Sequence, residues 1–150
     1  MNDDSPEDAP RSVGRTKTAG WQVGARRTLD LNAEEAWRLV TSADGVRAWL
    51  GERPAAELEP GARYRLSDGS EGEVRVWSPG SHLRLTWQPP GWERASTIQL
   101  RVLGSGARAV VALHQEHLPD ERTREARRTF FAGALDRLAA LAAGGDPSST

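Results

Sequence analysis

Hydrophobic and polar residues alternate along most of the chain between residues 62 and 118, and this period of two predicts β-strands. The predicted strands cover 62–66, 71–77, 82–88, 96–103 and 107–118. In the third of these, Leu83, Leu85 and Trp87 share one face and polar residues occupy the other. Glycine-containing turns join the strands, so the pattern predicts an antiparallel meander with one apolar face.

An earlier strand and two short helices precede this meander. Residues 21–31 alternate well enough for a first strand. Asn32 then stands three residues before Glu35, the spacing of a capping box, so a helix is expected to begin after Asn32. A second short helix is expected to contain Val46, Trp49 and Leu50 and to end at a glycine.

A long helix is predicted from 119 to 143, directly after the last strand. Phe131, Leu135 and Leu138 recur at helical spacing and form an apolar stripe that continues to Ala142. The charged residues of this segment, Arg127 among them, are interpreted as its solvent-facing side. The stripe can cover the apolar face of the meander, which needs such a partner.

The order of elements predicts an α+β protein in which a curved antiparallel sheet of six or seven strands wraps around the C-terminal helix. A further short strand near 56–58 is considered as well. Residues 20–143 are expected to form this helix-grip domain. The flanking segments 1–19 and 144–150 are rich in polar residues, glycine and proline, and we expect them to be disordered tails.

Composition narrows the classes of function. The formal net charge is −1 and no basic stripe is present, so we expect neither nucleic acid nor a charged membrane surface as partner. No apolar run approaches the roughly 18–20 residues of a membrane span. The acidic first eight residues lack the apolar core of a secretory signal, which favours a cytoplasmic location. Cysteine is absent, which excludes disulfides and thiolate chemistry.

Several segments, in order and spacing, are similar to a known family. They are Gly20-Trp21-Gln22-Val23-Gly24, Ala36-Trp37, Ala48-Trp49-Leu50-Gly51, Pro60-Gly61, His114-Gln115-Glu116-His117-Leu118 and Phe131 with Ala134-Leu135-Asp136-Arg137-Leu138. With them the chain resembles the activator of heat-shock protein 90 ATPase-like family, within the START and Bet v 1-like (SRPBCC) helix-grip superfamily. The resemblance covers roughly residues 20–142. It implies a pocket between the sheet and the C-terminal helix.

Aromatic side chains provide most of the candidate ligand site. The chain has six tryptophans, of which Trp21, Trp37 and Trp77 are interpreted as structural packing. Residues expected on the inner sheet face, the covering helices and the rim are predicted to contact a ligand: Trp49, Tyr64, Leu85, Trp87, Trp92, His117, Phe131 and Leu135. For the three tryptophans in this set, plain core packing is an equally good interpretation. Aromatic walls with few polar groups suit apolar or aromatic ligands.

The histidine-rich segment near residue 115 is a candidate metal site. On a strand, His114 and His117 point to opposite faces, and the zinc-protease pattern needs a helix and four-residue spacing. We therefore predict no metal and no cofactor, with His117 facing inward as a polar group at the pocket. No serine or threonine fits a nucleophile elbow, so no catalytic residue is assigned.

These observations favour non-catalytic binding of a hydrophobic or aromatic small molecule. One alternative is an enzyme of polyketide cyclase or dehydratase type, in which His117 or Tyr64 moves a proton. Another is a chaperone-associated protein-interaction module, which would bind a protein partner or form a homodimer.

Overall fold

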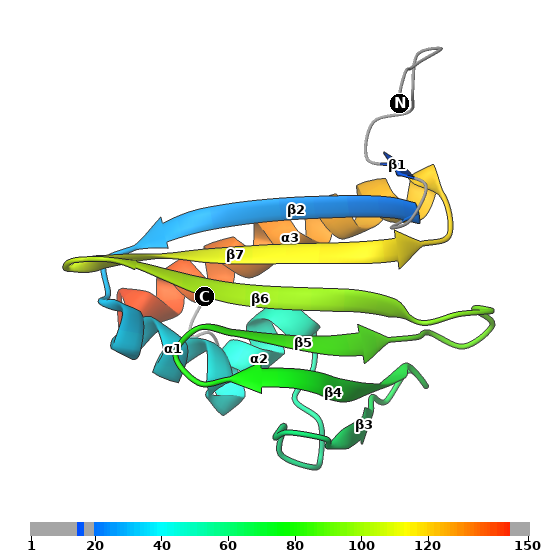
Figure 1. Cartoon of the computed structure of the whole chain (residues 1–150), viewed down its shortest axis with the longest axis horizontal. Helices are drawn as coiled ribbons and strands as arrows, with labels where there is room; N and C mark the ends of the chain where they lie inside the picture. The colour runs from blue at the N-terminus through cyan, green and yellow to red at the C-terminus, as the bar shows by residue number, and fades with distance from the viewer. Residues whose placement is uncertain (1–14, 17–19, 145–150) are drawn as a thin grey trace.

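A long antiparallel sheet with helices on one of its faces dominates the computed structural model, which describes residues 15–16 and 20–144 (Figure 1). The strands are β1 (Arg15–Thr16), β2 (Gly20–Leu29), β3 (Arg63–Arg65), β4 (Glu71–Ser78), β5 (His82–Trp87), β6 (Ser96–Ser105) and β7 (Arg108–Leu118). The helices are α1 (Ala33–Thr41), α2 (Ala43–Leu50) and α3 (Glu121–Ala142). Within the described ranges, the strands form one seven-stranded sheet in the order β1-β2-β7-β6-β5-β4-β3, with every pair antiparallel.

The predicted α+β helix-grip fold is confirmed. Strand β2 pairs with β7, so the first long strand lies beside the last strand of the meander. Helix α3 lies behind both of them in Figure 1. Residues 56–58 form no strand, and Leu58 enters the core from an irregular loop. Of the two predicted tails, only Arg15, Thr16 and Gly144 fall within the described residues.

The two short helices follow one another without a loop. The predicted capping box is present, since Asn32 Oδ1 accepts from Glu35 N at 2.8 Å and Asn32 N donates to Glu35 Oε1 at 2.9 Å. Ser42 ends α1 and also caps α2, which therefore begins at Ala43, three residues before Val46. Gly45 permits this junction, because a Cβ at that position would stand 1.9 Å from the carbonyl oxygen of Leu39.

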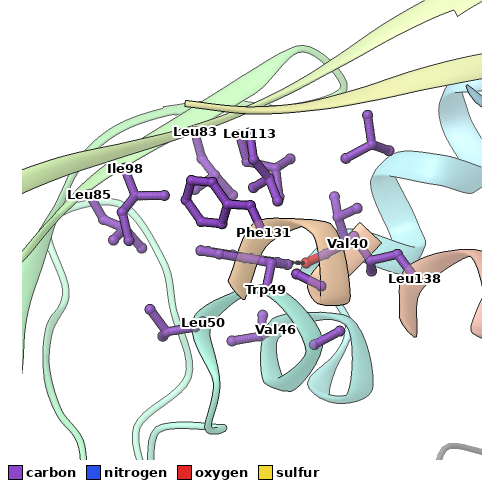
Figure 2. Packing of buried hydrophobic residues seen from close by; sticks show 14 of the residues in the cluster. Val40, Val46, Trp49, Leu50, Leu83, Leu85, Ile98, Leu113, Phe131 and Leu138 are labelled. Atoms are coloured by element: carbon purple, nitrogen blue, oxygen red, sulfur yellow. Dashed lines mark hydrogen bonds between the residues drawn. The ribbon is translucent and has the colours of Figure 1, made fainter. Parts of the chain in front are cut away.

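The core lies between the inner face of the sheet and all three helices. The alternating residues of β5, β6 and β7 supply one side of it, including Leu83, Ile98 and Leu113, which are all buried. Figure 2 shows Phe131 of α3 pointing toward the sheet, with Trp49 of α2 lying close to it. The predicted apolar faces of β5, β6 and α3 are therefore buried faces. In β4 the register shifts between Val74 and Val76, so Trp77 and not Val76 pairs with the buried Leu83.

None of the three helices in the described part of the chain combines the length and the apolar character needed to cross a membrane.

Candidate functional site

One arginine lies inside the core, on the face of α3 that packs toward the sheet. The charged residues of α3 predict a solvent-facing side that includes Arg127, and this prediction is wrong, because Arg127 is only 8% exposed. Arg127 stands four residues before Phe131, so the two share one face of the helix. This spacing was the signal that could have identified it, since the apolar stripe extends one turn toward the N-terminus through a cationic residue.

A chain of hydrogen bonds connects Arg127 with the sheet. Its Nε donates to Gln115 Oε1 at 2.8 Å, and Gln115 Nε2 donates to Ser96 Oγ at 2.8 Å. Ser96 Oγ donates in turn to the carbonyl oxygen of Trp87 at 2.7 Å. Gln115 and Ser96 are completely buried. This series of hydrogen bonds links α3 with β7, β6 and β5, so the three central strands define the position of Arg127.

Aromatic rings surround the guanidinium. Its Cζ lies 4.2 Å from the ring centroid of Trp87, 4.4 Å from that of Phe130 and 5.1 Å from that of Phe131. Trp92 meets Trp87 edge to face, with 5.4 Å between the ring centroids. Cation–π contacts of this kind stabilise a desolvated cation by about 2 kcal/mol or more. We call Tyr64, Trp87, Gln115, Arg127 and Phe130 the arginine cluster.

The positive charge of the arginine cluster has no carboxylate partner in the part of the chain that the structure describes. Among the described residues, no aspartate or glutamate forms an ion pair with Arg127. Burial away from water lowers the pKa of the guanidinium to about 10, an effect that the nearby Tyr64 opposes. Arg127 therefore remains charged at neutral pH. Its Nη2 is buried and has no hydrogen-bond partner within the described part of the chain.

Tyr64 contributes the other titratable group of the cluster. Its side chain is 5% exposed and its hydroxyl donates to the carbonyl oxygen of Thr86. Burial raises the pKa of Tyr64 well above its ordinary value, although Arg127 opposes that shift. The hydroxyl is therefore neutral at physiological pH and supplies no counter-charge to Arg127.

The titration of this tyrosine is directly observable, because Tyr64 is the only tyrosine in the chain. We expect no tyrosinate absorbance near pH 10, the ordinary range for tyrosine, as long as the protein stays folded. Since the pKa of Tyr64 is higher in the folded state, stability falls as pH rises above about 10, and tyrosinate should form together with unfolding. An ultraviolet titration followed in parallel by circular dichroism measures both. The chain unfolded in guanidinium is the control, and a reversible tyrosine titration near pH 10 in the folded state would contradict the assignment.

Apart from His117, the predicted site residues fall into two groups. Trp49, Leu85, Phe131 and Leu135 are buried members of the hydrophobic core. Trp49 also donates its Nε1 proton to the carbonyl oxygen of Val40 at 2.8 Å (Figure 2). Tyr64, Trp87 and Trp92 are brought together around Arg127, either directly or through one ring contact.

His117 differs from its predicted orientation. It has a positive φ of 66°, and the β2–β7 register shifts beside it, so the strand alternation is interrupted. Leu118 takes the buried position as a result, and His117 is half-buried with its Nδ1 3.5 Å from Arg94 Nη2. His114 is turned to Gln22, with 2.9 Å between Nε2 and Oε1.

A hollow of about 560 Å³ lies where β7 passes into α3. Residues from the start of β2, the loop after β5, the end of β7 and the first turn of α3 line it, including Trp92, His117 and Thr123. The charged residues Glu93, Arg94 and Asp120 belong to the same lining. Thr123 stands four residues before Arg127, on the same face of the helix. The hollow therefore lies one helical turn from the arginine cluster, and Trp92 belongs to its wall as well as contacting Trp87.

Comparison with known proteins gives a family match over most of the chain. Residues 30–143 match the family model described as "Activator of Hsp90 ATPase homolog 1-like protein". A curated mouse protein, "Activator of 90 kDa heat shock protein ATPase homolog 1", is 24% identical over 119 residues. That alignment covers 75% of this chain and 35% of the mouse protein, so the chain spans about a third of its relative's length.

Solved structures agree on the fold. The crystal structure of CalU16 from Micromonospora echinospora has a TM-score of 0.72 at 22% identity, covering 85% of this chain and 81% of CalU16. The solution structure of the Aha1 dimer from Colwellia psychrerythraea has a TM-score of 0.64 at 15% identity, covering 79% of this chain and 93% of that one.

Proposed function

This chain belongs to the Activator of Hsp90 ATPase homolog 1-like family, and we propose that its domain binds a hydrophobic or aromatic small molecule, without catalysis, between the sheet and α3. The observation that carries this proposal is the arginine cluster. Aromatic rings from β5 and α3 gather there around a single buried cation that has no carboxylate partner among the described residues. Small-molecule sites commonly combine apolar and aromatic walls with a few fixed polar groups.

The titratable groups of the cluster favour binding over turnover. A general base must be free to accept a proton near neutral pH. The Tyr64 hydroxyl donates to Thr86 and has a raised pKa, whereas Arg127 remains protonated. Neither group is therefore suited to abstract a proton.

The enzyme alternative, a cyclase or dehydratase, accordingly depends on His117. This residue lines the hollow and has a backbone conformation that is rare for residues other than glycine. In that case, a compound bound in the hollow would be released chemically altered, and substitution of His117 would abolish the change.

The first experiment is native mass spectrometry of the freshly purified full chain, followed by solvent extraction. We expect a stoichiometric extra mass that is released on denaturation, with an aromatic or hydrophobic compound in the extract. A weakly held ligand is tested by titration with the neutral fluorescent probe N-phenyl-1-naphthylamine.

The matched variants for this titration are Trp87→Leu and Trp37→Leu. Trp87 belongs to the arginine cluster, whereas Trp37 packs against Trp77 elsewhere, with ring centroids 5.8 Å apart. We expect Trp87→Leu to weaken probe binding about tenfold, the loss of one aromatic contact of about 1.4 kcal/mol, and Trp37→Leu to leave it unchanged. A bare protein mass together with no saturable probe binding would contradict the proposal. The protein-interaction alternative would then be preferred, including the homodimer.

A further inference from the structure

The guanidinium of Arg127 has unused capacity to donate hydrogen bonds. Arginine carries five N–H donors in one plane. Its Nε is used by Gln115, but Nη2 is buried and unpartnered among the described residues. A buried donor without an acceptor destabilises the folded state, and native structures contain few of them. An acceptor that belongs to another molecule would remove this unfavourable contribution.

The surrounding residues leave the positive charge uncompensated as well. The polar side chains connected to Arg127 are neutral: Gln115 and Ser96 through hydrogen bonds and Tyr64 as a close neighbour. Glu125, the closest carboxylate in the sequence, pairs with Arg124 at 2.6 Å and with Arg128 at 2.8 Å. The acceptor that fits this position is therefore an anionic oxygen.

The aromatic contacts indicate the rest of the ligand. The guanidinium lies over the rings of Trp87 and Phe130, which covers it with π-surface and leaves in-plane hydrogen bonds for a planar acceptor. A carboxylate matches this geometry, because its two oxygens can accept from the planar guanidinium side by side. Trp87 and Trp92 offer aromatic surface next to the same position.

The hollow at the start of α3 supplies room for the aromatic body. Its volume of about 560 Å³ is within the range of small-molecule sites, and Trp92 lies in its wall. Thr123 of the same wall is one helical turn before Arg127.

We propose that Arg127 anchors the carboxylate of a small aromatic acid, whose ring occupies the hollow and contacts Trp92 and Trp87. This inference rests on the proposed small-molecule function and names the chemical class of its ligand. Arg127 is then a binding residue with a direct contact to the ligand, and Gln115 positions it through the bond to Nε.

The test compares two probes of nearly equal shape, 2-naphthoate and its neutral amide 2-naphthamide, by isothermal titration calorimetry with the full chain. Hydrogen bonds to charged groups contribute about 1.5–3 kcal/mol, so we expect the wild type to bind 2-naphthoate roughly 10- to 150-fold more tightly than the amide. Arg127→Met should remove this preference. Arg128→Met, the adjacent exposed arginine, should retain it.

A second measurement needs no variant. The Arg127 Nε–H is buried and hydrogen-bonded, so its resonance in a nitrogen–proton spectrum should be observable and should shift on addition of 2-naphthoate but not of the amide. A preference for naphthoate that persists in Arg127→Met, or an unmoved Nε–H resonance at saturation, would overturn the inference.

The outcomes separate this inference from the proposed function. If both probes bind the wild type equally, an aromatic small molecule is still bound and only the role of Arg127 as carboxylate anchor is wrong. If neither probe binds and the purified protein carries no extractable compound, both proposals fail.

Discussion

The Trp49→Ala variant is expected to lose about 3–5 kcal/mol of unfolding free energy, the usual range for truncating a fully buried aromatic residue. Trp49 is 0% exposed and lies among Val46, Leu50 and Phe131 in the core (Figure 2). Because protein interiors are densely packed, the surrounding side chains can fill only part of the space that the indole leaves. Chemical denaturation followed by circular dichroism measures the loss.

The hydrogen bond of Trp49 adds a separate contribution. Its Nε1 donates to the carbonyl oxygen of Val40, so it joins α2 to the last turn of α1. Trp49→Phe retains most of the apolar contact and should cost about 1–3 kcal/mol, including the unpaired carbonyl group. Trp37→Ala is the control, because Trp37 is only half-buried and should lose clearly less than Trp49→Ala. Equal losses at positions 37 and 49 would contradict the assignment of Trp49 to the core.

The Arg127→Glu variant is expected to be destabilised by about 3–5 kcal/mol at neutral pH, the effect of an uncompensated buried charge. A carboxylate at this position would face Gln115 Oε1 and the negative faces of the surrounding rings. Both contacts that favour a cation would then oppose the anion. Denaturant titrations of the variant and the wild type at the same pH provide the comparison.

The pH dependence of the stability of Arg127→Glu distinguishes a loss caused by the buried charge from a loss caused by the shape of the new side chain. Burial should raise the pKa of the introduced glutamate in the folded state, so the folded protein binds more protons than the unfolded chain. Stability relative to the wild type should therefore be best below about pH 4.3, the ordinary pKa of glutamate, and should decrease as pH rises above it. A loss that is independent of pH would indicate a steric cause instead.

Two control variants complete this experiment. Arg127→Met removes the desolvated charge, but it also removes the cation–π contacts and the partner of Gln115. These effects oppose each other and are of similar size, so we expect a stability within about 1.5 kcal/mol of the wild type. Arg128→Glu reverses a charge at the exposed neighbouring position and should change stability by no more than about 0.5 kcal/mol. Near-wild-type stability of Arg127→Met would mean that the fold does not require the guanidinium, which supports a role for it in binding.

Most of the fold follows from local sequence patterns. The alternation of Leu83, Leu85 and Trp87 predicts which face of β5 is buried, because successive side chains of a strand point to opposite faces. The capping box of Asn32 and Glu35 is a local hydrogen-bond arrangement that depends on only four residues, so the start of α1 is predicted correctly. The apolar stripe of α3 likewise identifies Phe131 and Leu138 as buried.

The candidate site depends on contacts that are distant in the sequence. Arg127 stands at the helical spacing of the apolar stripe, but arginine is hydrophilic, so its residue type alone assigns it to the solvent. Only the folded chain brings Trp87 of β5 and Gln115 of β7 next to Arg127. Their cation–π contact and hydrogen bond offset part of the free-energy cost of removing the guanidinium from water. The same holds for His117, whose positive φ interrupts the alternation of β7 and moves Leu118 into the core.

The sequence by itself thus determined the order of the elements, their buried faces and the helix-grip architecture, because these depend on periodic patterns within single segments. The tertiary structure alone decided that the core contains a cation without an ion-pair partner among the described residues, since the free energy of burying a charge depends on the groups that other segments place around it.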